Sequence, residues 1–288
     1  MDFKESKDMR KYIFIDAHVH NLLSCFRMLN KNRLTLNAQK LKNNVDKLLS
    51  LGLSAVFTDH GTLEPYRSLQ RNELHGQQIL NESYTIINHG RYLEIKKDAK
   101  AIYIICGEEF TTRVNGRSTG HILAFGLKEQ ITDKMTPQAT IEAIKAQKGI
   151  IIAAHIFHYG GLRLKYLRQF YHEFDAVELT AADILNITNK RAINFIKQQQ
   201  HVRRINYIFD SDAHLIEHIG RGFWCFPRNL IEGRTDKEFI ASLRTHLRDP
   251  SAYIPCNMGR YKLKDVTLHY PLKYLELIRH YRGRKIKH

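Results

Sequence analysis

The chain has 288 residues, of which 43% are apolar and 10% aromatic, an ordinary composition that excludes wholesale disorder. Its 45 Lys and Arg outnumber its 29 Asp and Glu, and the formal charge of +16 points to an anionic partner such as nucleic acid, a nucleotide or a membrane surface. The length suits one large α/β domain or two small ones, and no apolar run approaches the roughly 18 residues of a membrane span.

Seven short runs rich in Ile, Val and aromatic residues are typical of strands buried on both faces, as in a parallel sheet. In chain order they cover residues 12–15, 54–57, 101–106, 121–125, 149–154, 175–179 and 205–209. Amphipathic spacing and capping residues predict helices between them at 41–52, 136–149, 190–200 and 235–243. The long polar connection 61–100 is expected to contain one or two helices. The repeated order of strand, polar loop and helix favours an α/β barrel or a doubly wound sheet.

The last 34 residues, from Pro255, hold nine Lys and Arg against two acidic residues, so this segment supplies +7 of the charge. We therefore expect a barrel domain at 1–254 and a basic extension at 255–288 that packs on it. The four cysteines, at positions 25, 106, 225 and 256, are widely spaced, which argues against a zinc ribbon or a disulfide framework. Reduced cysteines and the absence of a signal-peptide pattern favour a cytoplasmic protein.

Metal-ligating residue types follow several of the expected strands. Asp16, His18 and His20 alternate at the end of the first run, and residues at i and i+2 of a strand point to the same side. Further donors stand beside other strand ends: Asp59, His60, Glu108, Glu109, His121, His155, Asp212 and His214. Since the carboxyl ends of parallel barrel strands meet on one face, these side chains are expected to converge there. One of them, His121, precedes its apolar run, so it requires a different strand direction or a position at the rim.

Eight motifs in order resemble those of the PHP (polymerase and histidinol phosphatase) superfamily. They are DAHVH, FTDHGTL, GEEFTT, GHILAFGL, AAHIFH, NKRA, SDAH and HIGRG, and together they extend over about three quarters of the chain. The resemblance implies a distorted (β/α)7 barrel that holds a cluster of two or three divalent metal ions and hydrolyses phosphoesters.

The resemblance also implies a ligand set when it is carried over position by position. The ligands would be His18, His20, His60, Glu109, His121, His155, Asp212 and His214. Within this set Glu109 would bridge two ions, whereas Glu108, Asp16 and Asp59 would lie behind the ligands. Many family members carry an Asp or His five or six residues after the second His, where this chain has Cys25 and Phe26. Cys25 is thus either an extra thiolate ligand or, as we favour, a small buried thiol.

Mixed shells of His and carboxylate suit Mn²⁺, Zn²⁺ or Fe better than Ca²⁺ or Mg²⁺, which prefer oxygen ligands. A pair of such ions can hold a hydroxide that attacks the phosphoester. Candidate groups for the remaining phosphate charge are Arg191, Arg221, His158 and Arg163.

The leading hypothesis is a metal-dependent phosphoesterase, of phosphatase or exonuclease type, for nucleotides or nucleic-acid ends. A phosphatase for a small phosphorylated metabolite is the first alternative. The second is a non-catalytic nucleic-acid-binding module that keeps the barrel, although the nearly complete ligand set argues against lost activity. A membrane partner is not expected.

Overall fold

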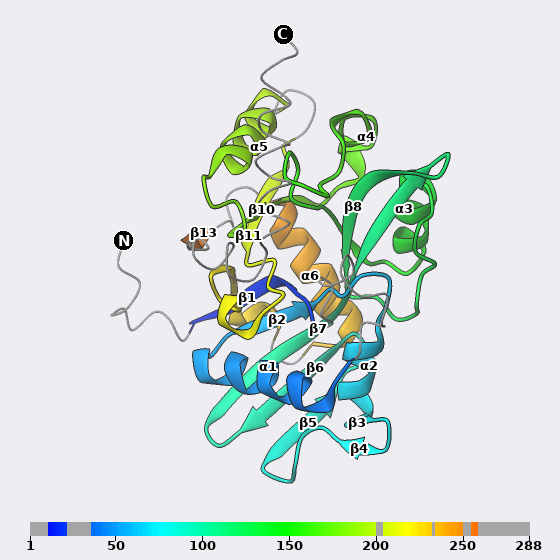
Figure 1. Cartoon of the computed structure of the whole chain (residues 1–288). Coiled ribbons are helices and arrows are strands. Elements are labelled where there is room, and N and C mark those ends of the chain that lie inside the picture. Colours follow the sequence, from blue (N-terminus) through cyan, green and yellow to red (C-terminus); the bar gives the residue numbers. More distant parts are fainter. Residues whose placement is uncertain (1–10, 22–35, 200–203, 232–233, 250–254, 259–288) are drawn as a thin grey trace.

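The computed structural model describes residues 11–21, 36–199, 204–231, 234–249 and 255–258 (Figure 1). No helix within these ranges is long and apolar enough to cross a membrane. Of the expected basic extension, residues 255–258 form a strand, and residues 259–288 lie outside the described residues.

A single mixed sheet organises the molecule, with strands in the order β11-β10-β9-β8-β7-β2-β1-β12-β13. Their bounds are β1 (Tyr12–Val19), β2 (Ser54–Phe57), β7 (Lys100–Val114), β8 (Arg117–Phe125), β9 (Ile150–Ala153), β10 (Ala176–Thr180), β11 (Asn206–Asp210), β12 (Gly222–Pro227) and β13 (Pro255–Met258). The first strand also meets the end of β11, because His20 N donates to Ala213 O at 2.8 Å and Ala213 N donates to His18 O at 3.0 Å. The strands from β11 to β12 thus form a nearly closed, barrel-like sheet, as the sequence predicts in outline.

The sheet is not parallel throughout, unlike the expectation from the apolar runs. The sets β1-β2-β7 and β9-β10-β11 are parallel, but β8 is antiparallel to both of its neighbours and β12 is antiparallel to β1. The reason for β8 is local, since Asn115 and Gly116 both have positive φ and form a two-residue turn between β7 and β8. This strand direction explains why His121 precedes its apolar run.

Six α-helices are present among the described residues: α1 (Ala38–Leu51), α2 (Glu64–Arg71), α3 (Pro137–Ala146), α4 (Leu164–Gln169), α5 (Ile187–Gln198) and α6 (Asp236–Arg248). Short 3₁₀ turns are η3 (Tyr171–Glu173), η4 (Ile216–His218) and η5 (Arg228–Leu230). The predicted helix signals are confirmed at α1, α3, α5 and α6. Thr136 caps α3, for example, and Thr235 with Glu238 forms the predicted capping box of α6.

The connection 61–100 agrees with its expectation of one or two helices, and it also contains short strands that were not expected. It contains one helix, α2, and then the short pair β3 (Glu73–Leu74) and β4 (Gln77–Gln78). A hairpin of β5 (Tyr84–Asn88) and β6 (Tyr92–Lys97) follows and pairs antiparallel with β7. The polar residues of this hairpin therefore alternate along strands and do not form a second amphipathic helix.

One end of the barrel is closed by α6, which passes behind the sheet in Figure 1. Its apolar side chains, including Phe239 and Leu243, pack with residues near the starts of β9 and β10, such as Ile150 and Ala176. Polar contacts at the same end join Arg248 to the carboxylate of Asp175, just before β10. The barrel interior at this end is thus apolar and filled, which leaves the opposite strand ends to form a site.

Candidate metal centre

The inward face of several strands changes from apolar to ionisable along its length. On β7, Ile105 belongs to the barrel interior and Glu109 lies on the same face four residues later. On β8, which runs the other way, Leu123 is the interior residue and His121 its inward neighbour. The same alternation places Glu178 after Ala176 on β10. Ionisable side chains from neighbouring strands consequently meet at one end of the barrel.

A change of register aims the histidines of β1 at the same place. Ile13 and Ile15 pack in the barrel interior, which would turn even-numbered residues outward in a regular strand. The pairing between β1 and β2 is irregular between Asp16 and Val19. After this irregularity His18 and His20 face the centre, and both are buried.

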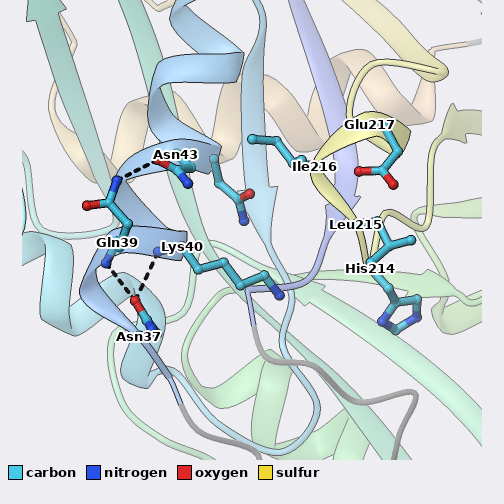
Figure 2. A pocket seen from close by; sticks show the side chains of 9 residues that line it. Asn37, Gln39, Lys40, Asn43, His214, Leu215, Ile216 and Glu217 are labelled. Atoms are coloured by element: carbon cyan, nitrogen blue, oxygen red, sulfur yellow. Dashed lines mark hydrogen bonds between the residues drawn. The ribbon is translucent and has the colours of Figure 1, made fainter. Parts of the chain in front are cut away.

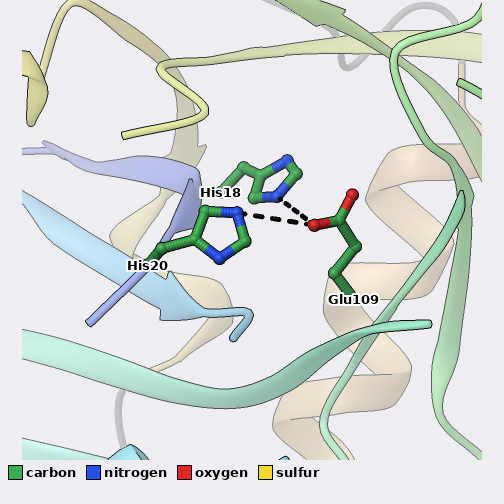
Figure 3. A group of neighbouring side chains, drawn as sticks. All are labelled: His18, His20 and Glu109. Carbon is green, nitrogen blue, oxygen red and sulfur yellow. Dashed lines mark ion pairs between the residues drawn. The ribbon is translucent and has the colours of Figure 1, made fainter. Parts of the chain in front are cut away.

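Glu109 is the residue on which the histidines converge, and Figure 3 shows it facing His18 and His20. Its Oε2 lies 3.4 Å from His18 Nε2, 3.5 Å from His20 Nε2 and 3.0 Å from His60 Nδ1. The other oxygen, Oε1, lies 2.6 Å from His121 Nδ1 and 3.8 Å from His155 Nε2. The two oxygens of one carboxylate therefore face two separate groups of imidazoles.

A second carboxylate, Asp212, completes the side of the centre that follows β11. Its Oδ1 lies 3.5 Å from His20 Nε2, 3.8 Å from His18 Nε2 and 3.3 Å from His214 Nε2. The rings of His20 and His214 stack with their centroids 4.0 Å apart. Asp212 has a positive φ of 49°, a backbone conformation that a non-glycine residue adopts only when its surroundings require it.

The segment after β9 brings His155 to the centre through close backbone contacts. A Cβ on Gly161 would lie 2.2 Å from the carbonyl oxygen of His155, and a Cβ on Gly120 would lie 2.3 Å from the carbonyl oxygen of Gly161. Only glycine permits these approaches. They hold the 155–162 segment against the start of β8, where His121 lies.

The arrangement fits divalent metal ions. Four groups of three residues have ligand atoms within 4.8 Å of one another: His18, His20 and Glu109; His20, Asp212 and His214; His60, Glu109 and His121; and His18, His155 and Glu178. Nε2 of His18 and both ring nitrogens of His20 are buried and make no hydrogen bond with another described residue. Ligands about 2.1 Å from one tetrahedral ion lie roughly 3.4 Å apart, which is close to the distances at Glu109 and Asp212.

The charge states of several of these groups also suit metal binding, which requires ionised carboxylates and neutral imidazoles. Burial raises the pKa values of Glu109 and Asp212, but nearby histidines outweigh it and hold both pKa values well below their ordinary range. Burial, together with the neighbouring His214, lowers the pKa of His20 well below its ordinary value. Burial also lowers the pKa of His121.

Sequence reasoning missed Glu178, a buried carboxylate that contacts two of the histidines. Its Oε1 accepts a hydrogen bond from His18 Nδ1 at 2.9 Å, and its Oε2 accepts from His155 Nδ1 at 3.0 Å and from His155 N at 2.7 Å. Asp210 lies nearby, and burial and the Glu178 carboxylate raise its pKa well above its ordinary value. The sequence does contain a signal for these two residues. Glu178 is the one acidic residue of β10, and Asp210 is the one acidic residue of β11.

The residues expected behind the ligands contact other groups. Asp16 accepts hydrogen bonds from Ser211 N and Oγ and from Gly220 N, which fixes the chain before Asp212. Asp59 accepts from the backbone and side-chain amides of Asn21, next to His20. Glu108 points away from Glu109 and accepts two hydrogen bonds from Gln130, while burial raises its pKa to about 9.

The four candidate phosphate-binding residues have fewer contacts with the metal centre than the candidate ligands do. The ring of His158 lies 6.0 Å from that of His155, measured between centroids. Arg221 donates from Nε to the carbonyl oxygen of Glu217. Arg163 and Arg191 are exposed and make no side-chain hydrogen bond or ion pair within the part of the chain that the structure describes. Cys25 lies outside the described residues.

Comparisons with known proteins address the fold. No family model matches the sequence, and no curated protein matches it. Among solved structures, PsfC from Pseudomonas syringae aligns with a TM-score of 0.56 and 18% identity, over 80% of this chain and 88% of PsfC. A candidate metal-dependent phosphoesterase from Bifidobacterium adolescentis aligns with a TM-score of 0.42 and 13% identity, over 82% of this chain and 97% of that one. The likeness to PsfC shows a shared fold alone.

Proposed function

We propose that this chain is a metal-dependent phosphoesterase of the PHP superfamily that hydrolyses phosphate esters of nucleotides or nucleic-acid ends. The observation that carries the proposal is Glu109, whose two oxygens face separate groups of histidines within 3.8 Å. A carboxylate in this position can bridge two divalent ions. The ordered motifs, the ionised Asp212 and the neutral His20 support the same chemistry.

On this proposal the residues of the centre have three different functions: they bind metal, orient the ligands or bind phosphate. His18, His20, Glu109 and Asp212 would hold one ion, and Glu109, His121 and His155 a second, while His60 and His214 would contribute to a third if Cys25 or another group completes it. When bound, Mn²⁺, Zn²⁺ or Fe would activate water and neutralise charge on the phosphoryl group. Glu178 keeps two histidines oriented, and His158, whose ring centroid lies 6.0 Å from that of His155, is a candidate for binding phosphate.

The experiment measures bound metals in the purified chain and then hydrolysis of phosphomonoesters, nucleoside bisphosphates and oligonucleotides with added Mn²⁺. His20→Ala should lose bound metal and hydrolysis, whereas His172→Ala, which changes an exposed histidine outside the centre, should keep both. Equal hydrolysis by the wild type and His20→Ala, with both chains folded, would contradict the proposal.

A phosphatase for a small metabolite remains the alternative substrate class. Activity on monoesters without salt-sensitive binding of oligonucleotides would favour it, because each phosphate contact in a polymer steepens the salt dependence.

A further inference from the structure

A pocket of about 270 Å³ lies beside His214, between the first turns of α1 and the segment that follows β11 (Figure 2). His214 stacks on His20 and contacts Asp212, so the pocket adjoins the candidate metal centre. A group in the pocket would therefore lie next to a phosphoryl group bound at that centre. Nothing in the proposed function yet uses this space.

The α1 side of the pocket presents carboxamide groups. Gln39 Nε2 donates to Asn43 Oδ1 at 2.7 Å, because residues four apart lie on the same face of a helix. This bond uses one donor and one acceptor. The carbonyl oxygen of Gln39 and the amide group of Asn43 make no hydrogen bond within the described residues and can pair with a bound molecule.

Asn44 provides a second, independent indication of a ligand. It lines the pocket, yet only 1% of its surface is exposed, on a helix face that otherwise buries Leu41, Val45 and Leu48. Its Nδ2 donates to Asn21 Oδ1 at 3.0 Å, whereas its buried Oδ1 accepts no hydrogen bond from a described residue. A buried acceptor without a donor costs free energy, and a donor that enters the pocket would satisfy it.

The opposite side of the pocket is mainly apolar. Leu215 and Ile216 lie there, and Ile216 is 39% exposed. Among its described residues the lining also holds one cation, Lys40, and one anion, Glu217, so the formal charges of the described lining balance. A pocket with an apolar wall, a carboxamide wall and no net charge is suited to a neutral group that has an apolar face and a hydrogen-bonding edge.

We propose that this pocket binds the alcohol portion of the phosphoester and that Gln39, Asn43 and Ile216 determine which alcohol is accepted. The inference rests on the proposed function. The chemistry is that of one nucleoside or one monosaccharide, each of which combines an apolar ring face with donors and acceptors at its edge. The volume of about 270 Å³ lies just below the range of about 300–1,000 Å³ for small-molecule sites, which favours a single unit over a polymer strand.

Binding of the free alcohols tests the pocket without requiring hydrolysis. Ligand-observed NMR on the full chain should detect saturable binding of adenosine or of glucose, and the one that binds identifies the class. Gln39→Ala combined with Asn43→Ala should weaken this binding by about tenfold or more, as should Ile216→Ser on the opposite wall. All three side chains are exposed, so these changes spare the core. Ser50→Ala, near the far end of α1, should leave binding unchanged.

Hydrolysis then separates the two proposals. If the esters are substrates, the double variant should lower kcat/KM for adenosine 5′-monophosphate or glucose 6-phosphate by about tenfold relative to that for methyl phosphate, whose alcohol portion is only methanol and too small to reach the pocket walls. Binding of neither alcohol, or equal binding by the wild type and both pocket variants, would overturn the pocket proposal. Binding of an alcohol without hydrolysis of any ester would instead overturn the proposed function and leave the pocket in place.

Discussion

Glu178 accepts a hydrogen bond from Nδ1 of His18 at 2.9 Å and thereby fixes which nitrogen of that imidazole faces Glu109. The same carboxylate accepts from Nδ1 of His155, so both rings present Nε2 to the centre. Burial raises the pKa of Glu178, but the two histidines outweigh it and lower the pKa to about 2. An ionised acceptor behind a metal-binding histidine orients the ring and makes it a stronger ligand.

Glu178→Gln should therefore weaken metal binding by about 10- to 100-fold, the usual effect of losing such a partner. The carboxamide offers one acceptor oxygen, so it cannot accept from His18 and His155 at the same time, and its NH₂ group would face a second donor. Competition titration of Zn²⁺ or Mn²⁺ against a chelator measures the change. Absorption of the Co²⁺-loaded chain should change as well, because the orientation of the imidazoles changes.

Glu108→Gln is the matched control for that substitution. Glu108 is also fully buried, but its carboxyl group contacts Gln130 and not a histidine. Because burial raises its pKa to about 9, the group is neutral at pH 7 and the carboxamide introduces no change of charge. Metal affinity should stay within a few-fold of the wild type. Equal losses in both variants would show that Glu178 contributes only to packing.

Removal of metal should lower the thermal stability of the chain. Glu109 and Asp212 face His18, His20 and His214 across gaps of 3.3–3.8 Å that an ion would bridge. At a free concentration 1,000 times Kd, an ion that binds only the folded state adds about 4 kcal/mol, which corresponds to roughly 7 °C in Tm for a chain of 288 residues. Scanning fluorimetry with and without a chelator checks this. The shift should persist in His172→Ala and vanish in His20→Ala.

The sequence predicts much of the fold because its elements are determined locally. Val45 and Leu48 mark the buried face of α1, and the Thr235 cap marks the start of α6. The direction of a strand is harder to predict from an apolar run, because the run has the same composition in either direction. The hairpin that reverses β8 depends on Asn115 and Gly116, a signal that lies outside the runs.

Only part of the candidate site could be predicted from the sequence. Ordered motifs identify residues such as His18 and Glu109, which the structure brings together because each faces the barrel interior from its own strand. Glu178 is missed because its importance depends on two histidines from other strands, 160 and 23 residues away. Arg191 and Arg221 are candidates because they stand beside the NKRA and HIGRG motifs, but neither a motif nor a charge determines where a long side chain points.

Acid should destabilise the chain partly through His246, which packs against Trp224 and Phe226 away from the metal centre. Burial lowers the pKa of His246, although Asp249 opposes the shift. Below about pH 6.5 the unfolded chain therefore binds a proton that the folded chain does not, and the free energy of unfolding falls with pH until the folded pKa is passed.

His246→Phe should remove this contribution. Between pH 7.5 and 5.5 the variant should gain stability relative to the wild type by at most about 1.4 kcal/mol per pH unit, as measured by urea unfolding at each pH. His172→Phe, at an exposed position, should show the same pH dependence as the wild type. A constant difference between His246→Phe and the wild type would contradict the assignment.

Two glycines of the β7–β8 hairpin should respond differently to alanine because only one of them is in close backbone contact. Gly116 has a φ of +72° and open space where a Cβ would project, so Gly116→Ala should cost about 1–2 kcal/mol from conformation alone. Gly120 has a φ of +106°, and its Cβ would lie 2.3 Å from the carbonyl oxygen of Gly161. Gly120→Ala should therefore cost more, because the backbone of the 155–162 segment must also move.

That movement displaces His155 and should weaken metal binding, whereas Gly116→Ala should leave metal affinity unchanged. Urea unfolding and metal titration of both variants test this, and equal effects on metal affinity would show that the glycine contact does not position His155.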